Sequence, residues 1–151
     1  MSLEQEVELI RQFPIFAKIQ PAMQKLLCFS AERLNYDSGQ IMFNAGDPGD
    51  AAYIIIAGAV EISVPTPSGP IIVNTLHKNE ILGEIAIFGE MPRTATAKAQ
   101  TKLETLKISK DLFIKIIREN PDAAIELIKM LASRLANTTT QLTRTRSGQS
   151  R

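Results

Sequence analysis

The sequence predicts a mainly β domain, a small antiparallel sandwich or jelly roll with helices at both ends. Short runs of β-favouring residues, separated by Gly and Pro, fill the middle of the chain, and several alternate apolar with polar positions. No segment of helical length lies between these runs, which disfavours a parallel α/β fold. The expected strands are residues 40–44, 52–56, 59–64, 70–76, 94–99 and 103–108.

The first third of the chain is expected to be helical. Apolar residues recur on one helical face from Leu3 to Phe13, before Pro14 interrupts the pattern. A second helix is expected from Pro21, which suits a first turn, to Leu34. A turn cluster follows, so the expected boundaries are 3–34 for the N-terminal helices and 36–108 for the β body.

The last third returns to helical patterns, over residues 109–143. Ser109 and the pair Asn120-Pro121 are typical of helix starts, since they offer a cap and a Pro in the first turn. Further on, apolar residues recur at alternating spacings of three and four, which predicts the seam of a short coiled coil and a homodimer through it. The seam residues are Ala124, Ile128, Leu131, Leu135, Thr138 and Leu142. Residues 144–151 are expected to form a frayed polar tail.

The composition excludes several classes of function. A net charge of +1, from 17 basic and 16 acidic residues, gives no general attraction to nucleic acid or to an anionic membrane. The single cysteine, Cys28, excludes an internal disulfide and fits a reducing, cytoplasmic location, where we expect it to be a buried structural thiol. The single histidine, His77, predicts no metal site, and no nucleophilic triad is recognisable. We therefore expect no catalytic residues and no enzyme activity, and a solvated tail carrying Arg134, Arg144, Arg146 and Arg151.

The segment from Gly83 to Ala95 carries the chemistry that points to a ligand. Gly83 permits a backbone geometry closed to other residues, and the next residues can form one helical turn whose amides point outward. Arg93 supplies a planar donor fork suited to phosphate, and Thr94 adds a hydroxyl beside it. Glu84 repels phosphate but accepts hydrogen bonds from a sugar hydroxyl. These groups together describe a nucleotide, although an exposed ion pair of Glu84 with Arg93 is an alternative that the residues alone leave open.

The same segment resembles the phosphate-binding cassette of the cyclic nucleotide-binding domain family, which includes catabolite-activator-type regulators, cyclic-nucleotide-dependent kinases and cyclic-nucleotide-gated channels. Upstream, the run from Phe43 to Ile55, followed by Gly58-Ala59-Val60, resembles the family's glycine-punctuated β-roll signature. Downstream, Leu131 to Leu135 resembles the start of its C-terminal hinge helix. The motifs stand in the family's order and spacing, and the resemblance spans the chain from about Ile10 to Leu142.

The resemblance implies an antiparallel β-roll over a domain of residues 1–143, and it implies a role for each matching residue of the cassette. Glu84, after Gly83, would accept the ribose 2′-hydroxyl, and Arg93 would pair with the cyclic phosphate. The amides of Ile85 and Ala86 would bind the same phosphate.

Other matches extend the implied site. Thr94 would contact a phosphate oxygen or a guanine amino group, and Ile62 and Val73 would line the sugar and base pocket. Thr138 and Thr139 match a hydroxyl pair that reaches the adenine across a dimer, and Thr138 has a second interpretation as a register device in the seam. Where the family often has Gly-Asp and two aromatics before the cassette, this chain has Asn79-Glu80-Ile81-Leu82, and Asn tolerates a left-handed turn nearly as well as Gly.

The resemblance therefore implies a non-enzymatic sensor of a 3′,5′-cyclic nucleotide, cAMP in preference to cGMP, that signals by moving its C-terminal helices. It implies no cofactor besides that ligand and no direct DNA binding, since few residues follow Leu142 and no helix-turn-helix module stands there. A ligand-free β-roll interaction module and a sensor fragment of a larger regulator or channel remain alternatives. The expected partners are the cyclic nucleotide, a second copy of the chain and a downstream protein.

Overall fold

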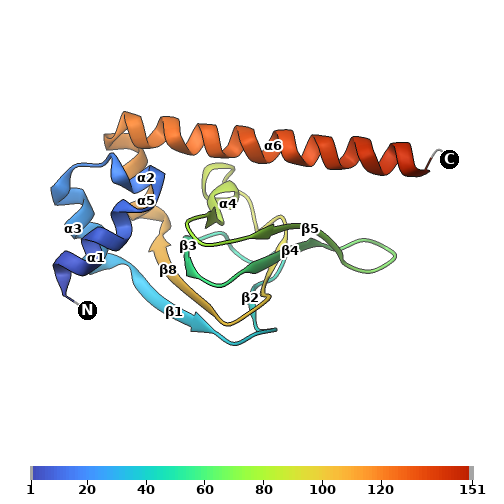
Figure 1. Ribbon diagram of the computed structural model, residues 1–151, viewed down its shortest axis with the longest axis horizontal. Coiled ribbons are helices and arrows are strands. Elements are labelled where there is room, and N and C mark those ends of the chain that lie inside the picture. Colours follow the sequence, from blue (N-terminus) through green and yellow to red (C-terminus); the bar gives the residue numbers. More distant parts are fainter. Residues whose placement is uncertain (1, 150–151) are drawn as a thin grey trace.

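A computed structural model of the chain describes residues 2–149, with the side chains of residue 85 and of residues 138–149 left undescribed. Two antiparallel four-stranded sheets form its centre, in the orders β1-β8-β3-β6 and β2-β7-β4-β5. Helices flank them on the N-terminal and C-terminal sides, which confirms the predicted fold class (Figure 1). The strands are β1 (Glu32–Tyr36), β2 (Ile41–Phe43), β3 (Ala51–Ala57), β4 (Val60–Val64), β5 (Ile71–Leu76), β6 (Ile81–Leu82), β7 (Thr96–Ala99) and β8 (Leu103–Ser109).

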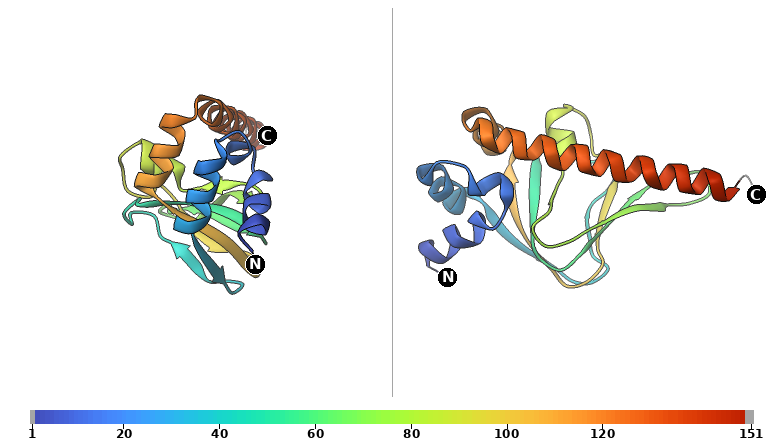
Figure 2. Two further views of the ribbon diagram at one scale, coloured as in Figure 1. Left: turned by 90° about the vertical axis from the view of Figure 1, so that its left-hand side faces the viewer. Right: turned by 45° about the horizontal axis from the view of Figure 1, so that its top comes forward.

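The helices at the two ends of the sequence pack together on one side of the β-roll. Figures 1 and 2 show the N-terminal helices beside α5 and the start of α6. A buried core joins them to the sheet through Phe16, Leu27, Ile54, Phe113 and Ile116, all at most 1% exposed. The helices are α1 (Leu3–Arg11), α2 (Pro14–Ala17), α3 (Pro21–Ser30), α4 (Glu84–Phe88), α5 (Lys110–Glu119) and α6 (Pro121–Gln149).

The sequence-based boundary between helix and sheet was wrong. The helix expected as far as Leu34 ends at Ser30, and Glu32–Tyr36 is instead an edge strand that pairs with β8. In this segment Leu34 and Tyr36 alternate with exposed residues and pack against the inner core of the roll. The residues after Ser30 also fit a helical pattern, but in the folded protein their pairing with β8 makes them a strand.

Helix α6 is longer than the sequence indicated. It continues through the expected tail to Gln149 and runs over α4 and past the β4–β5 hairpin (Figure 1). Within the expected seam, Leu131 is partly buried against the helical core, whereas Ile128 is 63% exposed. The side chains of Thr138 and Leu142 lie outside the described ones.

The cassette is fixed by two close backbone approaches. Gly83 joins β6 to α4 at φ +90°, and a Cβ there would stand 2.4 Å from Nη1 of Arg93. Gly49, in the loop before β3, lies so near α4 that a Cβ would meet the Ala86 Cβ at 2.2 Å. Asn79 takes φ +73° in the turn before β6, which bears out its left-handed role. Strand β6 was not foreseen, because two residues carry no detectable period.

Candidate functional site

A cavity of 390 Å³ lies between the β4–β5 hairpin, the cassette and α6. It brings together most of the residues that the sequence singled out: Ile62, Val73, Gly83, Glu84, Ala86, Arg93 and Thr94. The sequence missed the others that line it, which are Phe43, Val64, Asn74, Leu76, Leu82, Ala95 and Arg134. Its volume falls in the range of small-molecule sites, and its walls are mostly apolar with a few convergent polar groups.

Glu84 is the buried acid of this cavity. Only 1% of the residue is exposed, and its Oε1 accepts a 2.6 Å hydrogen bond from Nη1 of Arg134. Its Oε2 is buried with no hydrogen-bond partner among the described residues. Burial raises the pKa of the Glu84 carboxyl, and the charge of Arg134 opposes that rise. A ligand hydroxyl that reached this oxygen would therefore meet an acceptor that no described group uses.

Arg93 is the buried base of the cavity and is held by the backbone. Its Nη1 donates to the Gly83 carbonyl at 3.0 Å and its Nη2 to the Ala51 carbonyl at 2.7 Å. The guanidinium carbon lies 4.2 Å from the centroid of the Phe43 ring, within range of a cation–π contact. Burial lowers the pKa of Arg93, which still leaves it charged. Its Nε has no partner among the described groups, so a donor remains for an anion.

Arg134 is the functional candidate that the sequence-based prediction placed wrongly. It was expected on a solvated tail, yet its side chain is only 19% exposed and reaches the cavity from α6. Its Nη2 donates to the carbonyl of Ile81, and its Nη1 forms the ion pair with Glu84. Because Glu84 and Arg134 lie fifty positions apart in sequence, no local pattern could join them. Glu84 thus has a buried ion pair with Arg134 rather than the exposed pair with Arg93 left open by the sequence.

The remaining predicted residues are only partly placed. Thr94 is exposed at the cavity. Ile62 of β4 and Val73 of β5 both line it, and Val73 stands where the register between the two strands shifts. The side chains of Ile85, Thr138 and Thr139 lie outside the described ones, so their contacts stay predictions.

The arrangement suits one chemical class of ligand. Apolar side chains of both strands of the hairpin can cover a flat ring, while Glu84 offers an acceptor and Arg93 a donor with positive charge. A hydroxylated, anionic molecule with an aromatic portion meets all three. Over the described residues, no group of three or more His, Cys, Asp or Glu side chains is arranged to hold a metal ion. In residues 2–149 we also find no helix with the length and apolar character needed to cross a bilayer.

Comparison with known proteins identifies the family. Residues 33–120, more than half of the chain, match the profile of the cyclic nucleotide-binding domain. The CRP-like cAMP-activated global transcriptional regulator of Mycobacterium tuberculosis is 29% identical over 136 residues, which are 89% of this chain and 61% of that protein. The chain thus spans less than two thirds of that relative's length.

Two solved structures agree in fold. The sensor domain of the transcriptional regulator DNR from Pseudomonas aeruginosa superposes with a TM-score of 0.78 at 25% identity, covering 91% of this chain and 93% of that one. The catabolite activator protein of Thermus thermophilus superposes with a TM-score of 0.72 at 28% identity, covering 86% and 62%. With its β-roll, its cassette and its matching profile, the chain belongs to the cyclic nucleotide-binding domain family.

Proposed function

We propose that the cavity binds a 3′,5′-cyclic nucleotide and that the domain is a non-catalytic sensor. Two buried polar atoms of residues that line one cavity carry this proposal: Oε2 of Glu84 and Nε of Arg93 have no hydrogen-bond partner among the described residues. A buried polar atom without a partner costs roughly 1–3 kcal/mol, which a ligand hydroxyl and a ligand phosphate would recover. The amides of Ile85 and Ala86 complete the proposed phosphate site.

We further propose cAMP as the preferred ligand, with cGMP second. The match of Thr138 and Thr139 to an adenine-reaching pair supports this order, as does the cAMP-activated mycobacterial relative. The hydroxyl of Thr94 is the group that would serve cGMP.

The proposed signal passes through Glu84 to α6. One carboxylate oxygen holds Arg134, and the other is the oxygen proposed to hold the ribose. If the ligand binds the domain more tightly when α6 is in one position than in another, binding increases the fraction of molecules with α6 in that position. Output would pass to a protein partner, in the cytoplasm, rather than to DNA or a membrane, in keeping with a net charge of +1.

Calorimetric titration of the folded protein with cAMP and with cGMP tests the proposal. We expect saturable, one-to-one binding of cAMP and weaker binding of cGMP. Failure of both nucleotides to bind a protein with a cooperative unfolding transition would favour the ligand-free interaction module instead.

A 2′-deoxy analogue tests the role of Glu84. We expect 2′-deoxy-cAMP to bind the native protein about tenfold to a hundredfold more weakly than cAMP, since the buried acceptor then stays unpaired. In Glu84→Gln the two ligands are expected to bind with affinities within about threefold of each other. Equal affinities for the native protein would place the ribose elsewhere.

A homodimer through α6 is the proposed assembly. Ile125 and Ile128 are 50% and 63% exposed on the helix, and water-facing isoleucines on a long helix favour burial against a second copy. We expect Ile128→Asp to halve the mass measured by sedimentation equilibrium. Ser133→Asp, an exposed change on the same helix, is the control; if the native protein is already monomeric, the proposed dimer is wrong.

A further inference from the structure

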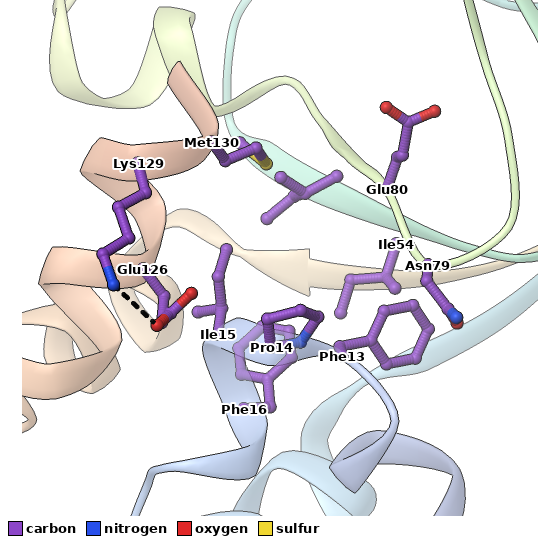
Figure 3. Close-up of a pocket in the computed structure, with 11 residues that line it drawn as sticks. Phe13, Pro14, Ile15, Phe16, Ile54, Asn79, Glu80, Glu126, Lys129 and Met130 are labelled. Carbon is purple, nitrogen blue, oxygen red and sulfur yellow. Dashed lines mark ion pairs between the residues drawn. The ribbon is translucent and has the colours of Figure 1, made fainter. Parts of the chain in front are cut away.

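A second cavity, of 310 Å³, lies outside the nucleotide site, between α2, strands β3 and β6, and α6. Figure 3 shows its apolar walls: Phe13 and Phe16 from the α2 segment, Ile54 from β3 and Met130 from α6. Ile15 of α2 and Ile81 of β6 also line it. The two phenylalanine rings meet edge to face, with centroids 6.4 Å apart.

The size and lining of this cavity are those of a ligand site. This cavity opens to solvent at one side. Phe16, Ile54 and Ile81 form its buried floor, at 1%, 0% and 3% exposure, whereas Pro14 and Lys129 at its mouth are exposed, and its volume is 310 Å³. An apolar cavity of roughly 150 Å³ suffices to bind benzene, so this one has room for about two rings.

The charged groups at the rim already have partners within the protein. Oε1 of Glu126 lies 2.9 Å from Nζ of Lys18 and 3.6 Å from Nζ of Lys129, the pair drawn in Figure 3. Glu80 accepts a hydrogen bond from the amide of His77, and its carboxylate turns away from the apolar side chains (Figure 3). A charged ligand would have to break one of these pairs or bury its own charge in the apolar walls. The rim therefore favours an uncharged ligand.

We propose that this cavity binds a small, uncharged apolar molecule the size of a two-ring aromatic compound. The inference does not depend on nucleotide binding, because the two cavities have different lining residues.

The two cavities nevertheless share two elements. Met130 lies one turn before Arg134 on α6, and the carbonyl of Ile81 accepts a hydrogen bond from Arg134. A molecule held between Ile81 and Met130 is therefore expected to change how α6 sits over Glu84, and with it the affinity for the nucleotide.

Methyl NMR of isoleucine-labelled protein, titrated with indole, tests the binding. We expect saturable shifts of the Ile15, Ile54 and Ile81 methyl groups that are larger than any shift of Ile62 in the nucleotide cavity. Indole-3-carboxylate, the charged counterpart, is expected to bind at least tenfold more weakly. The proposal fails if indole gives no saturable shift at these methyl groups, if it shifts Ile62 instead, or if the carboxylate binds more tightly.

Filling the cavity provides a second test. Met130→Trp is expected to weaken indole binding at least tenfold, whereas Ile72→Trp, at a position 58% exposed on β5, leaves it unchanged. Ile15→Phe is the replacement if Met130→Trp does not fold, and the native protein's preference for indole over its carboxylate requires no variant. Undiminished indole affinity in a folded, filled variant would overturn the assignment.

The link to the nucleotide site rests on the proposed function and is measured separately. The dissociation constant for cAMP is expected to change at least threefold in saturating indole. An unchanged constant would overturn the link alone, whereas absence of any cAMP binding would overturn the proposed function and leave the indole result standing.

Discussion

Replacing Arg93 with alanine is expected to lower the affinity for cAMP by at least about a hundredfold. A hydrogen bond to a charged group contributes about 1.5–3 kcal/mol, and Nε of Arg93 offers a phosphate one such bond together with the positive charge of the guanidinium. Arg93 is buried, and its Nε has no partner among the described residues, so water cannot easily replace the lost donor. Calorimetric titration of native and variant proteins measures the change.

The variant needs controls because Arg93 also ties the cassette to β3 through the carbonyls of Gly83 and Ala51. Arg93→Lys keeps the charge but loses the planar fork, so an intermediate affinity is expected. Adenosine, which lacks the phosphate, should bind the native protein and Arg93→Ala with equal affinity. If adenosine and cAMP lose affinity in proportion, Arg93 only supports the fold of the site and does not bind the phosphate.

The cassette could be predicted from sequence because its chemistry is local. Gly83, Glu84 and Arg93 lie within one short segment, and although the residues alone left an ion pair open, their order and spacing match the family's cassette motif. The backbone then places them as expected, with Gly83 at a positive φ and α4 starting at Glu84. The apolar wall was partly foreseen through Ile62 and Val73, whose alternation on strands is also a local pattern.

The sequence-based predictions that were wrong or incomplete concern contacts between segments that are distant in the sequence. Arg134 approaches Glu84 only because α6 folds back over the roll, and no local sequence pattern predicts the course of α6. The end of α3 at Ser30 is decided by the pairing of β1 with β8, whose residues come some seventy positions later. Asn74 was overlooked because a polar residue on an exposed hairpin strand is ordinary until the cavity beside it is seen.

Replacing Arg134 with methionine is expected to destabilise the protein by about 3–5 kcal/mol at neutral pH. Removing one partner of a buried ion pair leaves the other charge without compensation, and here the remaining Glu84 side chain is 2% exposed. Methionine keeps much of the volume of the arginine stem, so the loss reflects charge more than packing. Urea unfolding at pH 7.5, with the slope of the transition held in common, gives the difference in free energy.

The dependence on pH separates the charge from other causes of this loss. Burial raises the folded-state pKa of Glu84 above the ordinary value of 4.5, and Arg134 opposes that rise, so its removal raises the pKa further. Between the unfolded and the folded pKa the folded state binds more protons, and its stability therefore falls as the pH rises. We expect Arg134→Met to be close to native stability near pH 4.5 and to lose stability steadily above it.

The double variant Glu84→Gln with Arg134→Met removes both charges from the same buried site. Replacing both partners of a buried pair is often near neutral in stability, whereas removing one is not. The double variant should therefore recover most of the stability that Arg134→Met loses at pH 7.5, and it should lack the added pH dependence. A loss in Arg134→Met that is equal at pH 4.5 and pH 7.5, and that Glu84→Gln does not reverse, would mean that Arg134 holds α6 through the Ile81 carbonyl and packing rather than through Glu84.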